Sequence, residues 1–161
     1  MLIVSNTSPI MNLAVVGQLE LIEKIYEKIL IPKDVLQEIL AAVDLLPEIQ
    51  RIEKLPWIDI MEISNKSFLD ILLLELDLGE AAAISLAIER QADIILLDEI
   101  KGRKIASRLG LKYIGLLGIL IEGKRRGFID TVKPILDQLI TGAGFWIAKN
   151  LYNRVIQEVN E

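Results

Sequence analysis

The chain has 161 residues, of which 52% are hydrophobic and 25% are charged, and it contains no histidine and no cysteine. These two absences exclude an imidazole general base, a histidine- or cysteine-ligated zinc site, a thiolate nucleophile and a disulfide. The formal net charge is −5, yet residues 101–126 hold 8 basic side chains and only 1 acidic one. Any catalysis must therefore use carboxylates, hydroxyls, amines or a metal ion bound by oxygen.

The mean hydropathy of +0.44 raises the question of a membrane span. A spanning helix needs about 20 apolar residues, and the longest apolar runs, 71–78 and 116–121, contain charged side chains or are followed by them. Residues 1–19 have no basic segment of the kind that begins a signal peptide. We therefore expect a soluble, cytoplasmic protein that forms a single domain over residues 1–161.

In chain order, short β-prone apolar runs alternate with longer segments of helical period. This alternation predicts an α/β protein in which helices cover a central parallel sheet. Because the run 94–97 is continuously apolar, we expect this strand to be covered on both sides and to lie centrally. The predicted strands are Leu2–Ser5, Lys28–Ile31, Ile58–Glu62, Ile94–Leu97 and Lys112–Ile114.

Proline and glycine mark the helix boundaries. Ser8-Pro9 provides an N-cap followed by a proline at the first helical position, Pro32 opens the next helix, and Gly79 precedes a helix that is apolar nearly all round. We expect this apolar helix to be buried on more than one side. The predicted helices begin at Ser8-Pro9 and then cover Lys33–Val43, Glu80–Gln91, Glu99–Leu109, Leu116–Lys124, Thr131–Ile140 and Ala148–Glu161.

Polar residues follow two of the predicted strands at the point where each strand ends. Asn6, Thr7 and Ser8 follow the first strand, and Asp98 and Glu99 follow the central one. Ligands of open parallel sheets bind at the carboxyl ends of the strands. We therefore expect a functional site at this edge.

Two further carboxylates are open to more than one interpretation. Glu80 lies in the first turn of the apolar helix, where a carboxylate is also favoured for structural reasons alone. Glu38 lies on the flank of its helix beside the apolar stripe, so the helical period predicts that it faces water. In the basic block, the side chains either bind phosphate or solvate the outer face of a helix. These side chains are Lys101, Arg103, Lys104 and Arg108.

Several stretches together resemble one known family. They are Val4–Ile10, Ile31-Pro32 with Val35 and Glu38, Leu78–Ile84, Leu96–Glu99 with Lys101-Gly102-Arg103, Gly115–Gly118, Gly127, Val132–Leu136, Gly144-Phe145 and Leu151-Tyr152. In order and spacing they resemble the PIN-domain proteins, the metal-dependent ribonuclease fold of VapC-type toxins, and in particular a compact branch of that fold. The resemblance covers nearly the whole chain.

The resemblance implies a three-layer α/β/α sandwich with a central parallel sheet, in which acidic residues converge on Mg²⁺ or Mn²⁺. The implied metal positions are Asn6, Glu38, Glu80 and Asp98, with Glu99 as an additional acid, and Glu38, Glu80 and Asp98 are the implied catalytic residues. The hydroxyls of Thr7 and Ser8 are implied partners of phosphate or of a metal-bound water. Most PIN nucleases have aspartate where this chain has Asn6, a change that keeps an oxygen ligand and removes one negative charge.

Three functional hypotheses follow. The first is a Mg²⁺- or Mn²⁺-dependent endoribonuclease of the toxin–antitoxin type that cleaves RNA phosphodiester bonds. The alternative is a non-catalytic PIN-fold module that binds RNA or a protein, and the third is a structural or assembly module. The basic block predicts RNA contacts through Lys101, Arg103 and Lys104.

Two kinds of protein partner are predicted. The high apolar content and the apolar helix Glu80–Gln91 predict a homodimer, and the residues near Phe145, Trp146 and Leu151 offer a second apolar surface. The resemblance to toxins implies a small antitoxin protein as another partner.

Overall fold

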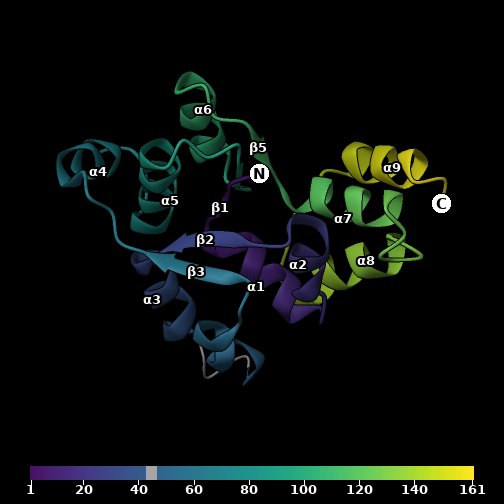
Figure 1. Cartoon of the computed structure of the whole chain (residues 1–161). Coiled ribbons are helices and arrows are strands. Elements are labelled where there is room, and N and C mark those ends of the chain that lie inside the picture. Colours follow the sequence, from purple (N-terminus) through teal and green to yellow (C-terminus); the bar gives the residue numbers. More distant parts are fainter. Residues whose placement is uncertain (43–46) are drawn as a thin grey trace.

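A five-stranded sheet in the order β3-β2-β1-β4-β5 forms the centre of the protein. The computed structural model describes residues 1–42 and 47–161 (Figure 1). Every pair of neighbouring strands is parallel. The strands are β1 (Ile3–Ser5), β2 (Ile29–Pro32), β3 (Ile58–Met61), β4 (Ile94–Leu96) and β5 (Tyr113–Ile114).

The five strands predicted from the sequence are all present, and each observed end lies within one residue of the predicted one. The strand expected to lie centrally, β4, is interior, with β1 and β5 on its two sides, but the middle position belongs to β1. Both strands are short and mostly buried, which explains why an apolar run alone did not distinguish them.

The helices that the sequence predicts are also present, with shifted ends. Helix α1 starts at Thr7 rather than after Ser8, and α3 ends at Ala41, whereas the predicted end at Val43 lies outside the described residues. The longer helices are α1 (Thr7–Val15), α3 (Lys33–Ala41), α5 (Leu78–Glu89), α6 (Ile100–Arg108), α7 (Leu116–Arg125), α8 (Lys133–Gly142) and α9 (Lys149–Glu158). No helix in the described part of the chain is long and apolar enough to cross a membrane.

Three short helical segments in the described part of the chain were not predicted from the sequence. They are α2 (Glu20–Tyr26), the 3₁₀ helix η2 (Pro47–Lys54) and α4 (Lys66–Leu72). Each spans about two turns, which is too short for the helical period to stand out in the sequence. Their apolar side chains still join the hydrophobic cores, since Leu21, Ile52 and Leu69 are all buried.

Alternate residues of the strands face two separate cores. Ile3 and Ile31 belong to one core, whereas Val4 and Leu30 belong to the other. Helices α1, α2, α3 and α7 contribute to the first core and α4, α5 and α6 to the second, on opposite faces of the sheet (Figure 1). The protein is therefore a three-layer α/β/α sandwich, as predicted.

Helix α5 is the most buried helical segment of the second core. Every residue from Gly79 to Ala87 is buried, which confirms the prediction that this helix is covered on more than one side. The prediction that the same helix offers an apolar surface to a second copy is wrong, because its apolar side chains are already covered within one chain.

We predict that enlarging this tightly packed helix destabilises the fold. Ala82 has no exposed surface, so Ala82→Leu should lower the free energy of unfolding by about 1–3 kcal/mol through overpacking. Urea unfolding measures this loss. The matched control is Asn153→Leu on the exposed side of α9, and equal stability of the two variants would contradict the packing described above.

Candidate active site

Asn6 lies at the carboxyl edge of the sheet with an amide oxygen that has no partner. Its backbone N–H donates to the carbonyl of Leu96 on the neighbouring strand at 3.0 Å. Asn6 occupies the N-cap position of α1, yet its side chain makes no capping bond. A capping oxygen accepts from the second or third N–H of the helix, and the third residue here is Pro9, which has none. The Oδ1 atom is buried and forms no hydrogen bond.

Asp98 lies two residues beyond β4, and its two carboxylate oxygens differ. Oδ1 accepts a hydrogen bond from the backbone N–H of Leu116 at 2.8 Å and lies 3.4 Å from Nη2 of Arg103. Oδ2 is buried and has no partner. Burial raises the pKa of the Asp98 carboxyl, while the Leu116 N–H and the Arg103 charge lower it. One oxygen of Asp98 is thus anchored, and the other is buried without a partner.

Arg103 is directed at Asp98. Its Nε donates to the carbonyl of Leu97 at 3.0 Å, and its guanidinium carbon lies 5.2 Å from the centre of the Tyr113 ring. Gly115 leaves the space that the guanidinium occupies, because a Cβ at Gly115 would overlap Nη2. Arg103 as an RNA contact stays a prediction, and its Nε and Nη2 atoms donate inside the site.

Glu80 is a buried carboxyl group with a strongly shifted pKa. It lies in the first turn of α5, where Asp77 caps the helix by accepting from the Glu80 N–H at 2.9 Å. Burial raises the pKa of Glu80 to about 8, with Asp77 and then Glu99 adding to the shift. The Oε2 atom has no partner, and a Cβ at Gly102 would lie 2.8 Å from it.

Glu38 is tied to the same edge through α1. Its Oε2 accepts a hydrogen bond from the Thr7 hydroxyl at 2.5 Å, and the side chain is half-buried. A Cβ at Gly79 would lie 2.6 Å from Oε1 of Glu38. The prediction that Glu38 simply faces water is therefore wrong, because a residue from another helix binds it. Ser8, by contrast, only accepts a long bond of 3.4 Å from the side chain of Asn12.

The contacts above place the predicted residues around one edge of the sheet. Thr7, which binds Glu38, follows Asn6 directly, and Gly79, which lies against Glu38, precedes Glu80 directly. Within residues 1–42 and 47–161, no three acidic side chains stand as a cluster that could hold a metal ion as they are. Of the buried side-chain oxygens without a hydrogen-bond partner in these residues, three belong to the predicted site residues Asn6, Glu80 and Asp98, and the others to Tyr26 and Ser85.

The unpartnered oxygens of these three site residues fit a hard divalent cation. Mg²⁺ and Mn²⁺ are bound in proteins by carboxylate, amide and carbonyl oxygens. Oδ1 of Asn6, Oε2 of Glu80 and Oδ2 of Asp98 are all buried, and none has a hydrogen-bond partner. Burying an oxygen without a hydrogen-bond partner is unfavourable. A bound cation would offset this penalty, so these three oxygens are suited to such an ion.

Three residues that shape the site were missed in the sequence. Asp77 caps α5 and raises the pKa of Glu80, while Gly102 and Gly115 leave room for Glu80 and Arg103. A capping signal was available, because Asp77 and Glu80 have the D-x-x-E spacing of a helix start. Gly102 inside a predicted helix was a second signal, since glycine there usually has a packing or functional reason.

A family model described as a PIN domain matches residues 2–161. The chain belongs to the PIN domain family. PIN domains are a nuclease fold whose members typically act on RNA and generally use divalent metals. The match does not distinguish VapC-type toxins from other PIN domains, and no curated protein matches this chain. The oxygen-rich edge of this PIN domain therefore lies in a fold associated with RNA cleavage.

We predict that Glu80 makes the stability of this PIN domain depend on pH. Its pKa rises from 4.5 to about 8 on folding, so the folded state holds a proton that the unfolded state loses. The free energy of unfolding should fall as pH rises from about 4.5 to about 8 and level off above that. Glu80→Gln should flatten this slope in urea unfolding with EDTA present.

The matched control for this titration is Glu75→Gln, a change at an exposed carboxylate. It should keep the pH dependence of the original protein. If Glu80→Gln kept the full slope as well, Glu80 would not be the group that titrates.

Proposed function

We propose that this protein is a Mg²⁺- or Mn²⁺-dependent endoribonuclease of the toxin–antitoxin type. The observation that carries the proposal is the set of buried oxygens without partners on Asn6, Glu80 and Asp98, in a chain that belongs to the PIN domain family. A general structural role for the three residues does not explain why their oxygens lack partners, since buried polar atoms are normally hydrogen-bonded.

The proposed mechanism assigns a role to each residue of the edge. Asn6, Glu80 and Asp98 would hold the metal ion, which supplies Lewis acidity for phosphoryl transfer when bound. Arg103 and the Leu116 N–H fix Oδ1 of Asp98, so that Oδ2 stays directed at the site. Asp98 needs this anchoring because a misplaced ligand weakens both binding and catalysis.

The remaining acids act around this set. Glu38 orients the Thr7 hydroxyl through the hydrogen bond that it accepts. Glu38 would be a further ligand of the metal ion, and the Thr7 hydroxyl would be a donor to a phosphate oxygen. With a pKa of about 8, the Glu80 carboxyl holds a proton at neutral pH, and it would have to give up this proton to serve as a metal ligand. Glu99 adds negative charge near Glu80 and is an additional acid of the site.

The proposed partners are RNA, a second copy and a small antitoxin protein, in the cytoplasm. Large apolar side chains stand on the surface, with Leu74 83%, Trp146 82% and Ile71 61% exposed. Ile71 and Leu74 lie at the end of α4 and in the turn after it, and Trp146 lies between α8 and α9. This exposure suits a protein partner that covers part of it.

A non-catalytic PIN-fold binding module is the second candidate. Two observations favour it: Asn6 brings no charge, and Arg103 adds a positive charge beside Asp98. Both features lower the negative charge available to hold a cation. RNA or protein binding without cleavage would then be the function.

We predict that Mn²⁺ raises the melting temperature of this protein. A ligand that binds only the folded state stabilises it by mass action, by about 2.7 kcal/mol at a hundred times its dissociation constant. The double variant Glu80→Gln with Asp98→Asn should lose the rise and lose cleavage of labelled RNA. Differential scanning fluorimetry and a gel assay measure the two effects.

Asp70→Asn together with Glu53→Gln is the matched control, because both residues are exposed carboxylates, on α4 and on η2. This pair should keep the Mn²⁺ response and the cleavage. A rise of the melting temperature that survives in the Glu80 and Asp98 variant would place the metal elsewhere.

We predict that Asn6→Asp separates the two candidate functions. The added charge should tighten Mn²⁺ binding and raise cleavage if the protein is a nuclease, and Asn6→Ala should lower both by removing the oxygen. Isothermal titration with Mn²⁺ and single-turnover cleavage are the measurements. Wild-type protein that is inert, together with an Asn6→Asp variant that cuts RNA, would favour the binding module.

A further inference from the structure

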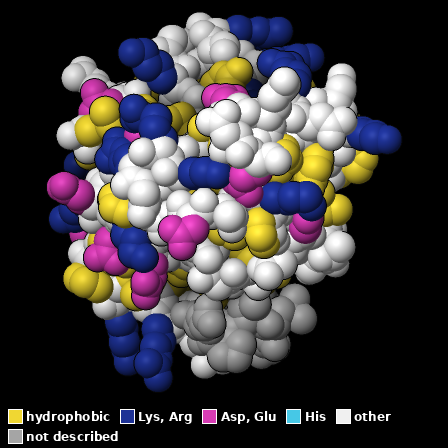
Figure 2. All heavy atoms as spheres, turned by 90° about the vertical axis from the view of Figure 1, so that its right-hand side faces the viewer, with side chains coloured by type: hydrophobic (Ala, Val, Ile, Leu, Met, Phe, Trp, Pro, Cys, Tyr) yellow, Lys and Arg dark blue, Asp and Glu magenta, His cyan; other side chains and the backbone are white. Residues whose placement is uncertain are grey.

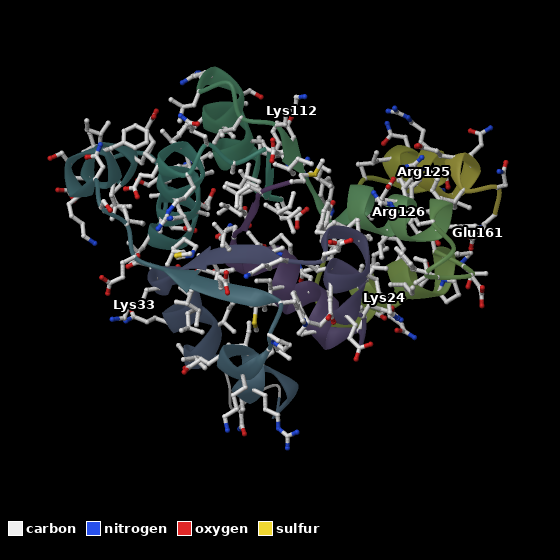
Figure 3. The ribbon with its side chains drawn as sticks, viewed as in Figure 1. Lys24, Lys33, Lys112, Arg125, Arg126 and Glu161 are labelled. Carbon is white, nitrogen blue, oxygen red and sulfur yellow. The ribbon has the colours of Figure 1, made fainter. Side chains whose placement is uncertain are left out.

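The basic block of residues 101–126 divides into a neutralised half and a free half. Lys124 pairs with Glu161 at 2.8 Å, and Arg125 and Arg126 both pair with Glu122, at 2.7 and 2.6 Å. Arg125, Arg126 and Glu161 lie on the α7–α9 side of the molecule (Figure 3). On that face, basic and acidic side chains alternate over the surface (Figure 2). This half of the block is therefore not a strong anion-binding surface.

Most of the free half lies on the outer face of α6, and Lys112 stands apart, just before β5. Lys101, Lys104 and Arg108 follow one another at spacings of three and four residues, so they project from the same side of the helix. All three are exposed, and none makes an ion pair with any residue that the structure describes. Three unpaired cations on one helix face form a row of positive charge.

A groove of about 350 Å³ runs beside this row. Its other wall is the segment that follows α4, where Leu74 is 83% exposed, and Ile105 contributes an apolar part of α6. Glu75 is the acidic residue among its lining side chains. The groove thus combines a cationic side with an apolar side.

The same helix connects the groove to the candidate active site. Gly102 and Arg103, on the inner face of α6, lie against Glu80 and Asp98, while Lys101 and Lys104 line the groove. The groove and the candidate active site therefore lie on two sides of the same turn of α6.

We infer that this groove holds a single-stranded segment of RNA, with its phosphates on Lys101, Lys104 and Arg108 and an unstacked base against Leu74. The inference rests on the proposed function for the choice of RNA as the polyanion. Single strands expose the apolar faces of their bases to protein side chains, whereas in a duplex these faces are stacked and hidden. An apolar wall opposite a cationic row therefore favours a single strand over a duplex.

The test compares two fluorescently labelled probes, a 12-nucleotide oligouridylate and a 12-base-pair RNA duplex, by anisotropy in EDTA. The triple variant Lys101→Glu, Lys104→Glu and Arg108→Glu should weaken oligouridylate binding at least ~10-fold. It should also lower the salt dependence of log Kd by about 0.7 for each lost phosphate contact, or about 2 in all. Leu74→Ala should weaken oligouridylate binding by about three-fold and leave duplex binding unchanged.

The controls carry the same chemical changes elsewhere. Lys54→Glu, Lys149→Glu and Arg154→Glu change the net charge equally at exposed sites away from α6, and Leu151→Ala removes an exposed leucine of α9. Neither control should alter oligouridylate binding. Equal losses in test and control variants would overturn the inference, as would a wild-type protein that binds neither probe.

Two further results separate this inference from the proposed function. Wild-type protein that binds oligouridylate through the groove but cleaves no RNA with Mg²⁺ or Mn²⁺ would remove the nuclease and keep the groove. Cleavage whose KM is unchanged in the triple variant would keep the nuclease and overturn the groove. A poly-glutamate peptide that binds as tightly as the oligouridylate would also overturn it, because the groove would then fit an acidic protein segment.

Discussion

Close packing of α5 into the second core is the constraint on which the rest of the structure depends. The helix contacts β1, β2 and β4, and its residues Ala81–Ala83 are fully buried. Small side chains let the helix backbone approach the sheet, so that Glu80 in the first turn comes to the carboxyl edge of the strands. Asp77 caps the helix there and fixes where it begins. A bulkier helix would have to stand farther from the sheet and would carry Glu80 away from Asn6 and Asp98.

Three glycines leave space for the side chains at the carboxyl edge of the sheet. Gly79, Gly102 and Gly115 each stand where a Cβ would overlap a site side chain, on Glu38, Glu80 and Arg103 respectively. None of these glycines adopts a positive φ angle. Their role is therefore to leave space for charged groups rather than to permit an unusual backbone.

The sequence predicted the sheet well because its strands are apolar runs bounded by polar residues. The edge position of Asn6 and Asp98 followed from the rule that ligands gather where parallel strands end. Glu38 was misjudged because the helical period shows only which face of a helix is apolar, and not which polar residues of other helices meet its flank. The hydrogen bond from Thr7 depends on how α1 and α3 pack, which no local pattern contains.

Arg103 and its basic neighbours mark a second limit of sequence reasoning. Charge alone did not separate Arg103, which binds Asp98, from Lys101 and Lys104, which stay free. The paired arginine lies between the two unpaired lysines on α6. Only the orientation of this helix on the sheet decides which of the three side chains meets Asp98. The net charge of the whole chain likewise did not predict where free positive charge lies. Glu122 and Glu161 neutralise the C-terminal end of the basic block, and the cations of α6 at its other end stay unpaired.

The arrangement of helix ends has an electrostatic consequence for this edge. In a parallel sheet, each helix that follows a strand starts at the carboxyl edge, and here α1, α6 and α7 start at Thr7, Ile100 and Leu116. The first amide of α7 already donates to Asp98. Each helix start presents a partial positive charge of about half a unit. The carboxylates therefore lie in a field that offsets part of their mutual repulsion, and the same field draws a phosphate group toward them.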